Sequence, residues 1–175
     1  MFSLLNSLLF MRKIAVLPLL LAITFAFWGC QSDDPDKIAE RDRQKLLKYI
    51  DENELDAIEH SSGLFYVVER EGSGSVHPDL SSLIVIRYKG KLLDGTIFDS
   101  NNQAKLQLFS TVRGWQIGIP LFREGGKGML LIPSALGYGS FAQWGIPRNS
   151  CLIFEFELLG IIWKILKKLS YVSME

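Results

Sequence analysis

Phe98 and Asp99 lie side by side in the stretch YKGKLLDGTIFDS, residues 88–100, just after the turn-forming pair Asp94-Gly95. A large aromatic ring beside a carboxylate combines an apolar surface with a hydrogen-bond acceptor. Each residue alone has a simpler interpretation, because aromatic rings usually belong to a core and Asp often forms local bonds in turns. The pair is therefore a candidate site only if further residues along the chain share its pocket.

Other kinds of chemistry lack their sequence signals. The chain has two cysteines and two histidines: Cys30, Cys151, His60 and His77. Their spacing fits no structural zinc site, so no metal is expected. The stretch GSGS at 72–75 lacks the Lys-Ser/Thr of a phosphate loop, and EGGKGM at 124–129 does not open a strong helix. A Gly-x-Ser-x-Gly nucleophile motif is also absent from the sequence.

The charge balance argues against a nucleic-acid partner. The 175 residues include 19 basic and 19 acidic ones, and the first 29 contain Arg12 and Lys13 but no acid. The remainder carries 17 basic and 19 acidic residues, a net charge of −2. Nucleic-acid binding needs a basic footprint, and none is visible. The length fits one domain with short extensions.

Residues 1–29 are expected to be a signal peptide. Two basic residues precede an uncharged, mainly apolar run at 14–28. This run fits the apolar core of a secretory signal and is short for a membrane span of about 20 residues. Residues 1–10 are apolar too, so either Met1 or Met11 can be the start.

The apolar run ends in Phe27-Trp28-Gly29-Cys30, which resembles a bacterial lipobox. In that motif the cysteine becomes the lipid-bearing first residue. Gly29 and Cys30 match the pattern, whereas Phe27 and Trp28 depart from it, and the alternative is an uncleaved anchor. If Cys30 carries lipid, Cys151 has no intrachain partner and no disulfide is expected.

A helical arm is expected after the lipid-bearing cysteine. Residues 31–36, QSDDPD, fit either a surface-export signal of some bacterial groups or a solvated tether. Apolar residues at helical spacing predict a helix at 36–51 with Asp36 as its cap. Residues 53–60 predict a shorter helical turn. The SSG stretch at 61–63 breaks the pattern and marks a domain boundary.

The rest of the chain favours strands. Five stretches are rich in β-branched and aromatic residues or alternate in polarity: 64–70, 83–93, 105–109, 128–133 and 151–160. In the last, Phe154 and Phe156 share one face, while Glu155 and Glu157 share the other. A single short helix is possible at 114–122. These elements predict an α+β domain.

Three long stretches together resemble the FKBP-type peptidyl-prolyl cis-trans isomerases. They are VIRYKGKLLDGTIFDS (85–100), VRGWQIGIPLFREGGKGMLLIPSALGYG (112–139) and IPRNSCLIFEFELLGI (146–161). The resemblance implies a twisted antiparallel β-sheet wrapped around the short helix at 114–122, within a domain at 61–161. Residues 30–60 then hold the lipidated Cys30, the tether and the arm, and residues 162–175 form a C-terminal tail.

The resemblance also implies the site. The expected catalytic residues are Tyr88, Phe98, Asp99 and Tyr138. The expected substrate-binding residues are Val112, Trp115, Ile146, Phe154 and Leu106. In the family, a substrate proline ring packs over the indole that matches Trp115, and the main-chain N–H that matches Val112 binds a substrate carbonyl. The carboxylate that matches Asp99 is held by hydroxyls of the flanking tyrosines.

Two positions depart from the family pattern. Leu106 stands where the family often has Phe, so one pocket wall is expected to be smaller. Thr111 replaces a common aliphatic residue beside Val112. A third point concerns geometry: adjacent strand residues point to opposite faces, so Phe98 and Asp99 reach one pocket only through a bulge or bend, which the resemblance implies.

The resemblance implies an isomerase that acts on proline-containing polypeptides and needs no cofactor. We expect it in the bacterial cell envelope, anchored to a membrane through Cys30 and assisting the folding of exported proteins. The order of signal, lipid-bearing cysteine, arm and domain is similar to the gliding-motility-associated isomerase lipoproteins. The alternative is an FKBP-like chaperone or scaffold that binds apolar segments without turnover. The arm is either a spacer or a dimerisation element.

The tail has two interpretations. Its apolar residues follow helical spacing: Ile162, Ile165, Leu166 and Leu169. They predict either a helix lying on a membrane surface or a terminal fringe that packs on the domain or dangles from it.

Overall fold

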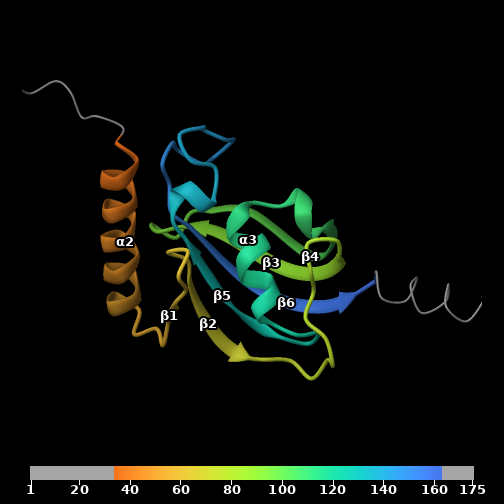
Figure 1. The fold of residues 1–175 in the computed structure, drawn as a ribbon. Helices are drawn as coiled ribbons and strands as arrows, with labels where there is room; N and C mark the ends of the chain where they lie inside the picture. The colour runs from red at the N-terminus through yellow and green to blue at the C-terminus, as the bar shows by residue number, and fades with distance from the viewer. Residues whose placement is uncertain (1–33, 163–175) are drawn as a thin grey trace, which may run out of the picture. The chain divides into compact units, whose positions relative to one another are not determined.

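The described residues, 34–162 of a computed structural model, begin with a helix and form a six-stranded antiparallel sheet with a second, short helix between two of its strands (Figure 1). The first helix is α2 (Pro35–Glu52). The strands are β1 (Ile58–Glu59), β2 (Phe65–Arg70), β3 (Leu83–Leu92), β4 (Ile97–Gln107), β5 (Lys127–Ile132) and β6 (Leu152–Ile161). Their order across the sheet is β1-β2-β5-β6-β3-β4. The predicted signal peptide, Cys30 and residues 163–175 of the tail lie outside the described residues.

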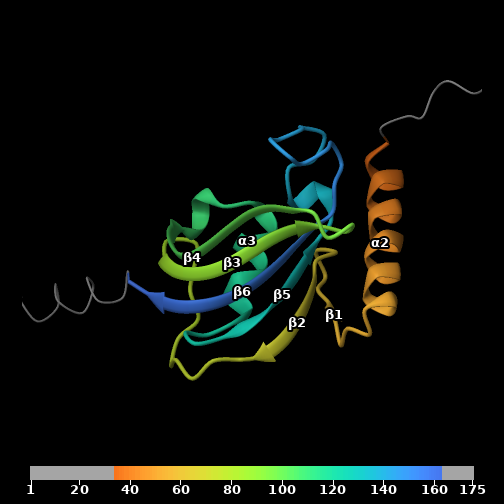
Figure 2. The same cartoon turned by 180° about the vertical axis from the view of Figure 1, so that it is seen from behind.

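Short helical segments connect the strands. Between β4 and β5 the chain forms η1 (Leu108–Ser110), α3 (Arg113–Gly118) and η2 (Ile119–Leu121). After β5 it forms η3 (Ser134–Leu136). Helix α3 lies across one face of the sheet, as Figures 1 and 2 show from opposite sides. The predicted α+β class, with a twisted antiparallel sheet around one short helix, is confirmed.

The main core lies between α3 and the sheet. Trp115 and Ile119 of the α3–η2 segment are buried in it together with Ile86, Leu130 and Phe156 from the strands. Burial of these side chains is the dominant favourable contribution to folding. The alternation predicted for β6 is confirmed, because its phenylalanines face this core while its glutamates are only partly buried.

Helix α3 forms despite its poor local propensity because its glycines allow close packing. A Cβ on Gly114 would lie 2.6 Å from Ile132 Cδ1, and one on Gly118 would lie 2.6 Å from Leu130 Cδ2. Residues with side chains would therefore push the helix away from β5. The glycines that weaken the helix by propensity are the residues that let it reach the sheet.

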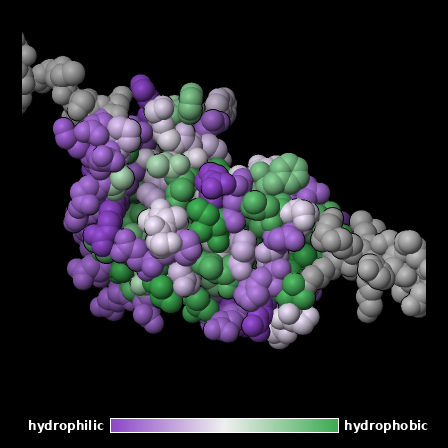
Figure 3. Space-filling view, viewed as in Figure 1, coloured by the Kyte–Doolittle hydropathy of each residue, from purple (hydrophilic) through white to green (hydrophobic). Residues whose placement is uncertain are grey.

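Helix α2 packs on the sheet in a second, smaller cluster. Leu46 is fully buried there with Phe65, Leu131 and Cys151. Leu131 of β5 faces this cluster, while its neighbours Leu130 and Ile132 face α3, as strand alternation requires. Arg43 adds an ion pair to Glu59 of β1, with Nε 2.8 Å from Oε1. The outward surface of α2 is mainly hydrophilic (Figure 3).

Three local predictions need correction. Residues 53–60 do not form a helical turn, because Ile58 and Glu59 form β1 and pair with Tyr66 and Phe65 of β2. The sheet edge offers the backbone hydrogen bonds that local propensity cannot anticipate. Pro35 opens α2, so Asp36 lies in the first turn instead of capping the helix.

The third correction concerns the strand predicted at 105–109. The strand β4 is longer and begins at Ile97. It ends at Gln107, and Leu108 and Phe109 already belong to η1. Polar residues in the middle of β4 hide the strand pattern in the sequence, since that part of the strand is exposed.

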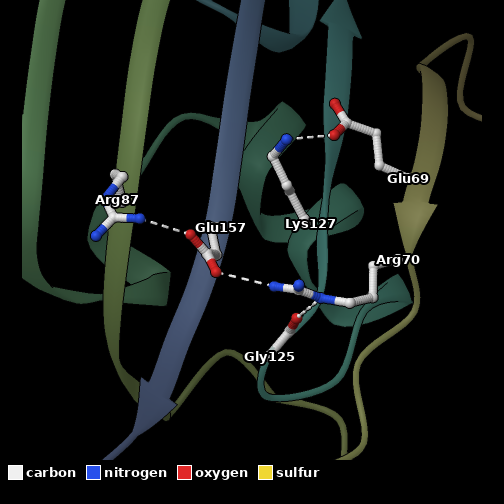
Figure 4. A network of polar contacts seen from close by, with 6 residues as sticks. All are labelled: Glu69, Arg70, Arg87, Gly125, Lys127 and Glu157. Carbon is white, nitrogen blue, oxygen red and sulfur yellow. Dashed lines mark hydrogen bonds and ion pairs between the residues drawn. The ribbon is translucent and has the colours of Figure 1, made fainter.

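Charged side chains cross the strands on the sheet face away from α3 (Figure 4). Glu157 of β6 binds two arginines: Arg87 Nη1 is 2.7 Å from its Oε2 and Arg70 Nη2 is 2.8 Å from its Oε1. Lys127 pairs with Glu69 beside them. Exposed pairs of this kind contribute roughly 0–1 kcal/mol each, so they serve the solubility of this face more than the fold.

Candidate active site

A pocket of about 200 Å³ opens between α3, the strands β3, β4 and β6, and the loops that follow η1 and η3. It is lined by Tyr88, Asp99, Leu106, Ser110, Thr111, Val112, Trp115, Tyr138 and Phe154. Seven of the nine residues predicted for substrate or catalysis are in this lining. The other two, Phe98 and Ile146, belong to the core cluster around it.

Aromatic rings form the floor and walls of the pocket. The ring centroid of Trp115 lies 5.1 Å from that of Tyr88 and 5.1 Å from that of Phe154, with interplanar angles of 87° and 83°. Edge-to-face contacts of this kind fix the orientation of each ring. Trp115 is only 3% exposed, because α3 carries it into the core.

The indole nitrogen of Trp115 has no hydrogen-bond partner among the described residues. The nitrogen is itself buried, and a buried N–H without a partner is unfavourable.

Asp99 brings a carboxylate to this apolar site. The hydroxyl of Tyr88 donates a hydrogen bond to Asp99 Oδ2 over 2.7 Å. Burial, then this hydrogen bond and the carboxylate charge, raise the pKa of Tyr88 above its ordinary value. Burial and the charge of Asp99 also raise the pKa of Tyr138. Tyr88 thus hydrogen-bonds to the carboxylate, while the charge of Asp99 acts on Tyr138.

The bulge predicted at Phe98 and Asp99 is present. Asp99 lies opposite Gly90 of β3, whereas Ile97 lies opposite Lys91, so Phe98 is the extra residue of β4. An extra residue changes the facing of the strand at that point, which lets both side chains turn toward the same side.

Phe98 supports the pocket from behind. Its ring lies 5.5 Å from the Phe154 ring at 85°, and Phe98 is absent from the pocket lining. Gly90 makes the fit possible, since a Cβ there would lie 2.7 Å from the Phe98 ring and 2.8 Å from Phe154. Phe98 thus packs beside the pocket, and its expected catalytic role stays a prediction.

Ile146 and Val112 reach the site from loops. Ile146 is 4% exposed and packs in the core cluster beside the pocket. Val112 precedes α3 in an extended conformation, and its carbonyl accepts the N–H of Trp115 over 2.9 Å. Val112 lines the pocket, and the contact of its main chain with a substrate stays a prediction. Leu106 lines the wall, as expected.

Ser110 is the lining residue that the sequence analysis did not single out. Its hydroxyl donates to the Gln107 carbonyl over 2.7 Å, and the Thr111 hydroxyl donates to the Leu108 carbonyl over 2.7 Å. Both hydroxyls are thus engaged by the η1 turn. Two small hydroxyl residues just before a helix were the available signal, because such residues favour turns and caps.

The site contains no candidate metal centre. Among residues 34–162, no group of three or more His, Cys, Asp or Glu side chains could hold a metal ion. Cys151, the cysteine within this range, is a free and buried thiol, and burial raises its pKa to about 12. Within the same range, no helix is both long and apolar enough to cross a membrane.

Comparisons with known proteins agree with this architecture. The family described as FKBP-type peptidyl-prolyl cis-trans isomerase matches residues 74–159. The FkpA isomerase of Buchnera aphidicola subsp. Schizaphis graminum is 43% identical over 105 residues, which cover 58% of this chain and 42% of that protein. The chain thus spans about two-fifths of the length of this curated relative.

Two crystal structures extend the comparison to the fold. Escherichia coli FkpA superposes with a TM-score of 0.60 and 27% identity, covering 90% of this chain and 89% of that one. AtFKBP13 superposes with a TM-score of 0.55 and 30% identity, covering 61% of this chain and 98% of that one. The fold and pocket define an FKBP-like domain. The chain belongs to the FKBP-type peptidyl-prolyl cis-trans isomerase family.

Proposed function

We propose that the protein is a peptidyl-prolyl cis-trans isomerase that speeds the folding of proline-containing polypeptides. The observation that carries the proposal is the aromatic pocket in which Asp99 accepts the Tyr88 hydroxyl beside Trp115. A proline ring fits such an apolar floor, and the carboxylate with its tyrosines supplies polarity at one wall. FKBP relatives with this activity in their names support the assignment.

The pocket can lower the rotation barrier without covalent chemistry. Rotation about an X–Pro bond is slow, with a barrier near 20 kcal/mol, because the amide is stabilised by resonance. Resonance places charge on the carbonyl oxygen, and water favours that charge-separated planar form. A pocket walled by Trp115, Phe154 and Tyr88 excludes water and so favours the twisted amide, whose charge separation is smaller.

Fixed donors contribute the second part of the mechanism. We expect the main-chain N–H of Val112, a residue of the pocket lining, to donate to a substrate carbonyl without reorganisation. Donors that fit the twisted amide better than the planar one lower the barrier selectively. Both parts of the proposed mechanism use only groups of the protein itself.

An FKBP-like chaperone that holds apolar segments without turnover is the second candidate. The observation that favours it is the exposed apolar pair of the loop after η3, where Phe141 is 74% and Trp144 is 101% exposed. Exposed apolar patches mark surfaces that bind other polypeptides. The two functions can coexist. An isomerase accelerates refolding at a small fraction of the substrate concentration, whereas a chaperone without turnover acts only near equimolar amounts.

Refolding of a proline-limited protein separates these functions. The purified 175-residue chain at a small fraction of the substrate concentration should accelerate the slow phase while leaving its final yield unchanged. A Trp144→Ser variant is the matched control, because it removes exposed apolar surface and leaves the pocket intact. If acceleration appears only near equimolar amounts, or if only aggregation is suppressed, the isomerase proposal is overturned.

We also propose that the protein acts as a lipoprotein of the bacterial cell envelope. The support is the Gly29-Cys30 pair after the short apolar run, together with the acidic residues that follow. The lipid on Cys30 would hold the domain at a membrane, where exported polypeptides emerge unfolded. This arrangement is similar to that of gliding-motility-associated isomerase lipoproteins.

A further inference from the structure

A buried carboxylate on α2 has no part in the pocket itself. Asp42 is 0% exposed, although α2 is otherwise rich in exposed charged residues. Burying an ionisable carboxylate is unfavourable unless hydrogen bonds compensate it. The hydrogen-bond partners of the side chain lie in the segment between β5 and β6, and Arg41 of the same helix pairs with its Oδ1 at 3.7 Å.

Asp42 contacts both ends of that segment. Its Oδ2 accepts hydrogen bonds from the Ser134 N–H, over 3.0 Å, and from the Ser134 hydroxyl. Its carbonyl oxygen lies 3.9 Å from the Cys151 sulfur, which donates to it. Ser134 starts η3 just after β5, and Cys151 immediately precedes β6. One turn of α2 thus fixes the two points where the segment leaves and rejoins the sheet.

Ser134 passes this restraint to a pocket residue. Its carbonyl accepts the N–H of Gly137 over 3.0 Å and the N–H of Gly139 over 2.8 Å. Tyr138 lies between these two glycines, and its ring lines the pocket. The main chain on both sides of Tyr138 is therefore tied to the residue that Asp42 holds.

Tyr138 depends on this restraint more than Tyr88 does. Gly139 has φ +59° and Gly137 caps η3 in an unusual conformation, and glycines on both sides give the backbone wide freedom. Tyr88 instead sits within β3, and its hydroxyl is bound to Asp99. Loss of the Ser134 anchor would free the Tyr138 backbone while leaving Tyr88 in place.

We propose that Asp42 is a positioning residue for the pocket: it sets the position of Tyr138 through Ser134. This role deepens the proposed isomerase function and rests on it, and it makes the helical arm part of the active domain. A spacer helix would need no buried acid that is bonded to the pocket segment.

The first test compares the catalytic efficiency of variants in proline-limited refolding. Asp42→Ala should lower kcat/KM about fivefold, in the range of couplings carried through packed networks. Asp42→Asn keeps a carbonyl acceptor for Ser134 and should stay within about twofold of the parent. Arg43→Gln, which loses only the exposed pair to Glu59, should match the parent. Ser134→Ala, which keeps the N–H bond, is the milder variant should Asp42→Ala fail to fold.

A double-mutant cycle separates positioning from general loss of stability. In a Tyr138→Ala background, Asp42→Ala should change kcat/KM by less than about twofold, because the group it positions is gone. Equal effects of Asp42→Ala in both backgrounds would overturn the proposal. So would parental kcat/KM in a folded Asp42→Ala protein whose melting temperature alone has dropped.

A readout that is independent of activity completes the test. The chain has five tyrosines, so fluorotyrosine labelling gives few resonances, and Tyr138→Phe identifies the one from Tyr138. Asp42→Ala should shift or broaden the Tyr138 resonance and leave that of Tyr66 unchanged. An unchanged Tyr138 resonance would refute the positioning role even if the parent proves to be an isomerase. If the parent lacks isomerase activity, the proposed function fails while this measurement still decides the position of Tyr138.

Discussion

Asp99 is the one carboxylate in the pocket lining, and its surroundings explain how an acid can serve an apolar site. Aromatic rings surround it, and the Tyr88 hydroxyl bonds to it at 2.7 Å. The carboxylate remains exposed enough to meet solvent, so its removal should affect the polarity of the pocket more than the core. Substitution of Asp99 is therefore a direct test of the proposed chemistry.

We expect Asp99→Val to lower kcat/KM at least about tenfold, equivalent to about 1.4 kcal/mol of transition-state stabilisation. The thermal melt should remain close to that of the parent. Refolding kinetics and calorimetry on both proteins provide the check. Asp94→Asn is the matched control, since Asp94 lies in the hairpin turn outside the pocket and Asn can still accept the Thr96 N–H. Full activity in a folded Asp99→Val protein would refute the role proposed for this carboxylate.

The raised pKa values of the pocket tyrosines predict that kcat/KM stays constant from neutral pH to about pH 10. Burial first, then the bond to Asp99, raise the pKa of Tyr88 above 10.0, and burial raises that of Tyr138. A raised phenol pKa means that the neutral hydroxyl persists to higher pH, so the Tyr88–Asp99 hydrogen bond survives at pH 10. The stability linked to these groups is fully present below 10.0 and is lost as pH rises through the folded-state pKa values.

The measurement is a pH profile of kcat/KM together with the tyrosinate absorbance. We expect a level profile from neutral pH to about pH 10, the ordinary tyrosine pKa. A Tyr88→Phe variant identifies which part of the absorbance change belongs to Tyr88. An activity midpoint clearly below the ordinary tyrosine value, absent from that variant, would contradict the assignment.

Among the elements, the bulged strand β4 and the short helix α3 position the pocket residues in different ways. The bulge in β4 places Phe98 behind Phe154 and Asp99 in the pocket, which a regular strand could not do. Helix α3 instead has poor local propensity, and its glycines let it pack closely against β5. Gly114 is one of its two tightest contacts with β5, at 2.6 Å from a built Cβ to Ile132.

Gly114→Ala tests which effect dominates in α3. Helix propensity alone would make the variant more stable by roughly 0.5–1 kcal/mol. Overpacking against Ile132 costs about 1–3 kcal/mol, so we expect net destabilisation. Activity should fall as well, because Trp115 is the next residue. Denaturant unfolding provides the measurement, with Gly160→Ala as control, where the built Cβ meets only Val85 at 4.0 Å. A more stable Gly114→Ala protein would show that propensity wins.

At the scale of the whole molecule, the described fold joins the arm to the domain. Helix α2 buries Leu46 on the sheet and bonds to the loop after β5 through Asp42. Within residues 34–162, the arm therefore packs as part of the FKBP-like domain. Because α2 packs on the sheet, a lipid on Cys30 would tether the arm and the domain to the membrane together.

Cys30→Ala should abolish fatty-acid labelling and membrane association in a bacterial host that processes lipoproteins. Cys151→Ala is the matched control, because Cys151 is buried and free and should not carry lipid. Labelled palmitate and membrane fractionation provide the check. A Cys30→Ala protein that still fractionates with membranes as fully as the parent would rule out the lipid anchor.

The sequence by itself determined the class of fold and the approximate positions of β2, β3, β5 and β6. The alternation in β6 identifies its two faces, and Asp94-Gly95 identifies the hairpin, because these signals depend on neighbours a few residues apart. Long motifs in the right order supplied the pocket residues by resemblance. Seven of them meet in one lining, with Phe98 and Ile146 just outside it.

Only the tertiary structure showed where the arm packs and where several elements end. Residues 53–60 carry a local helical pattern, yet Ile58 and Glu59 pair with β2 because an open sheet edge offers them hydrogen bonds. Asp42 looks like one more exposed acid on a charged helix. Its burial against Ser134 depends on a contact between residues 92 positions apart, and no local pattern in the sequence encodes such a distance.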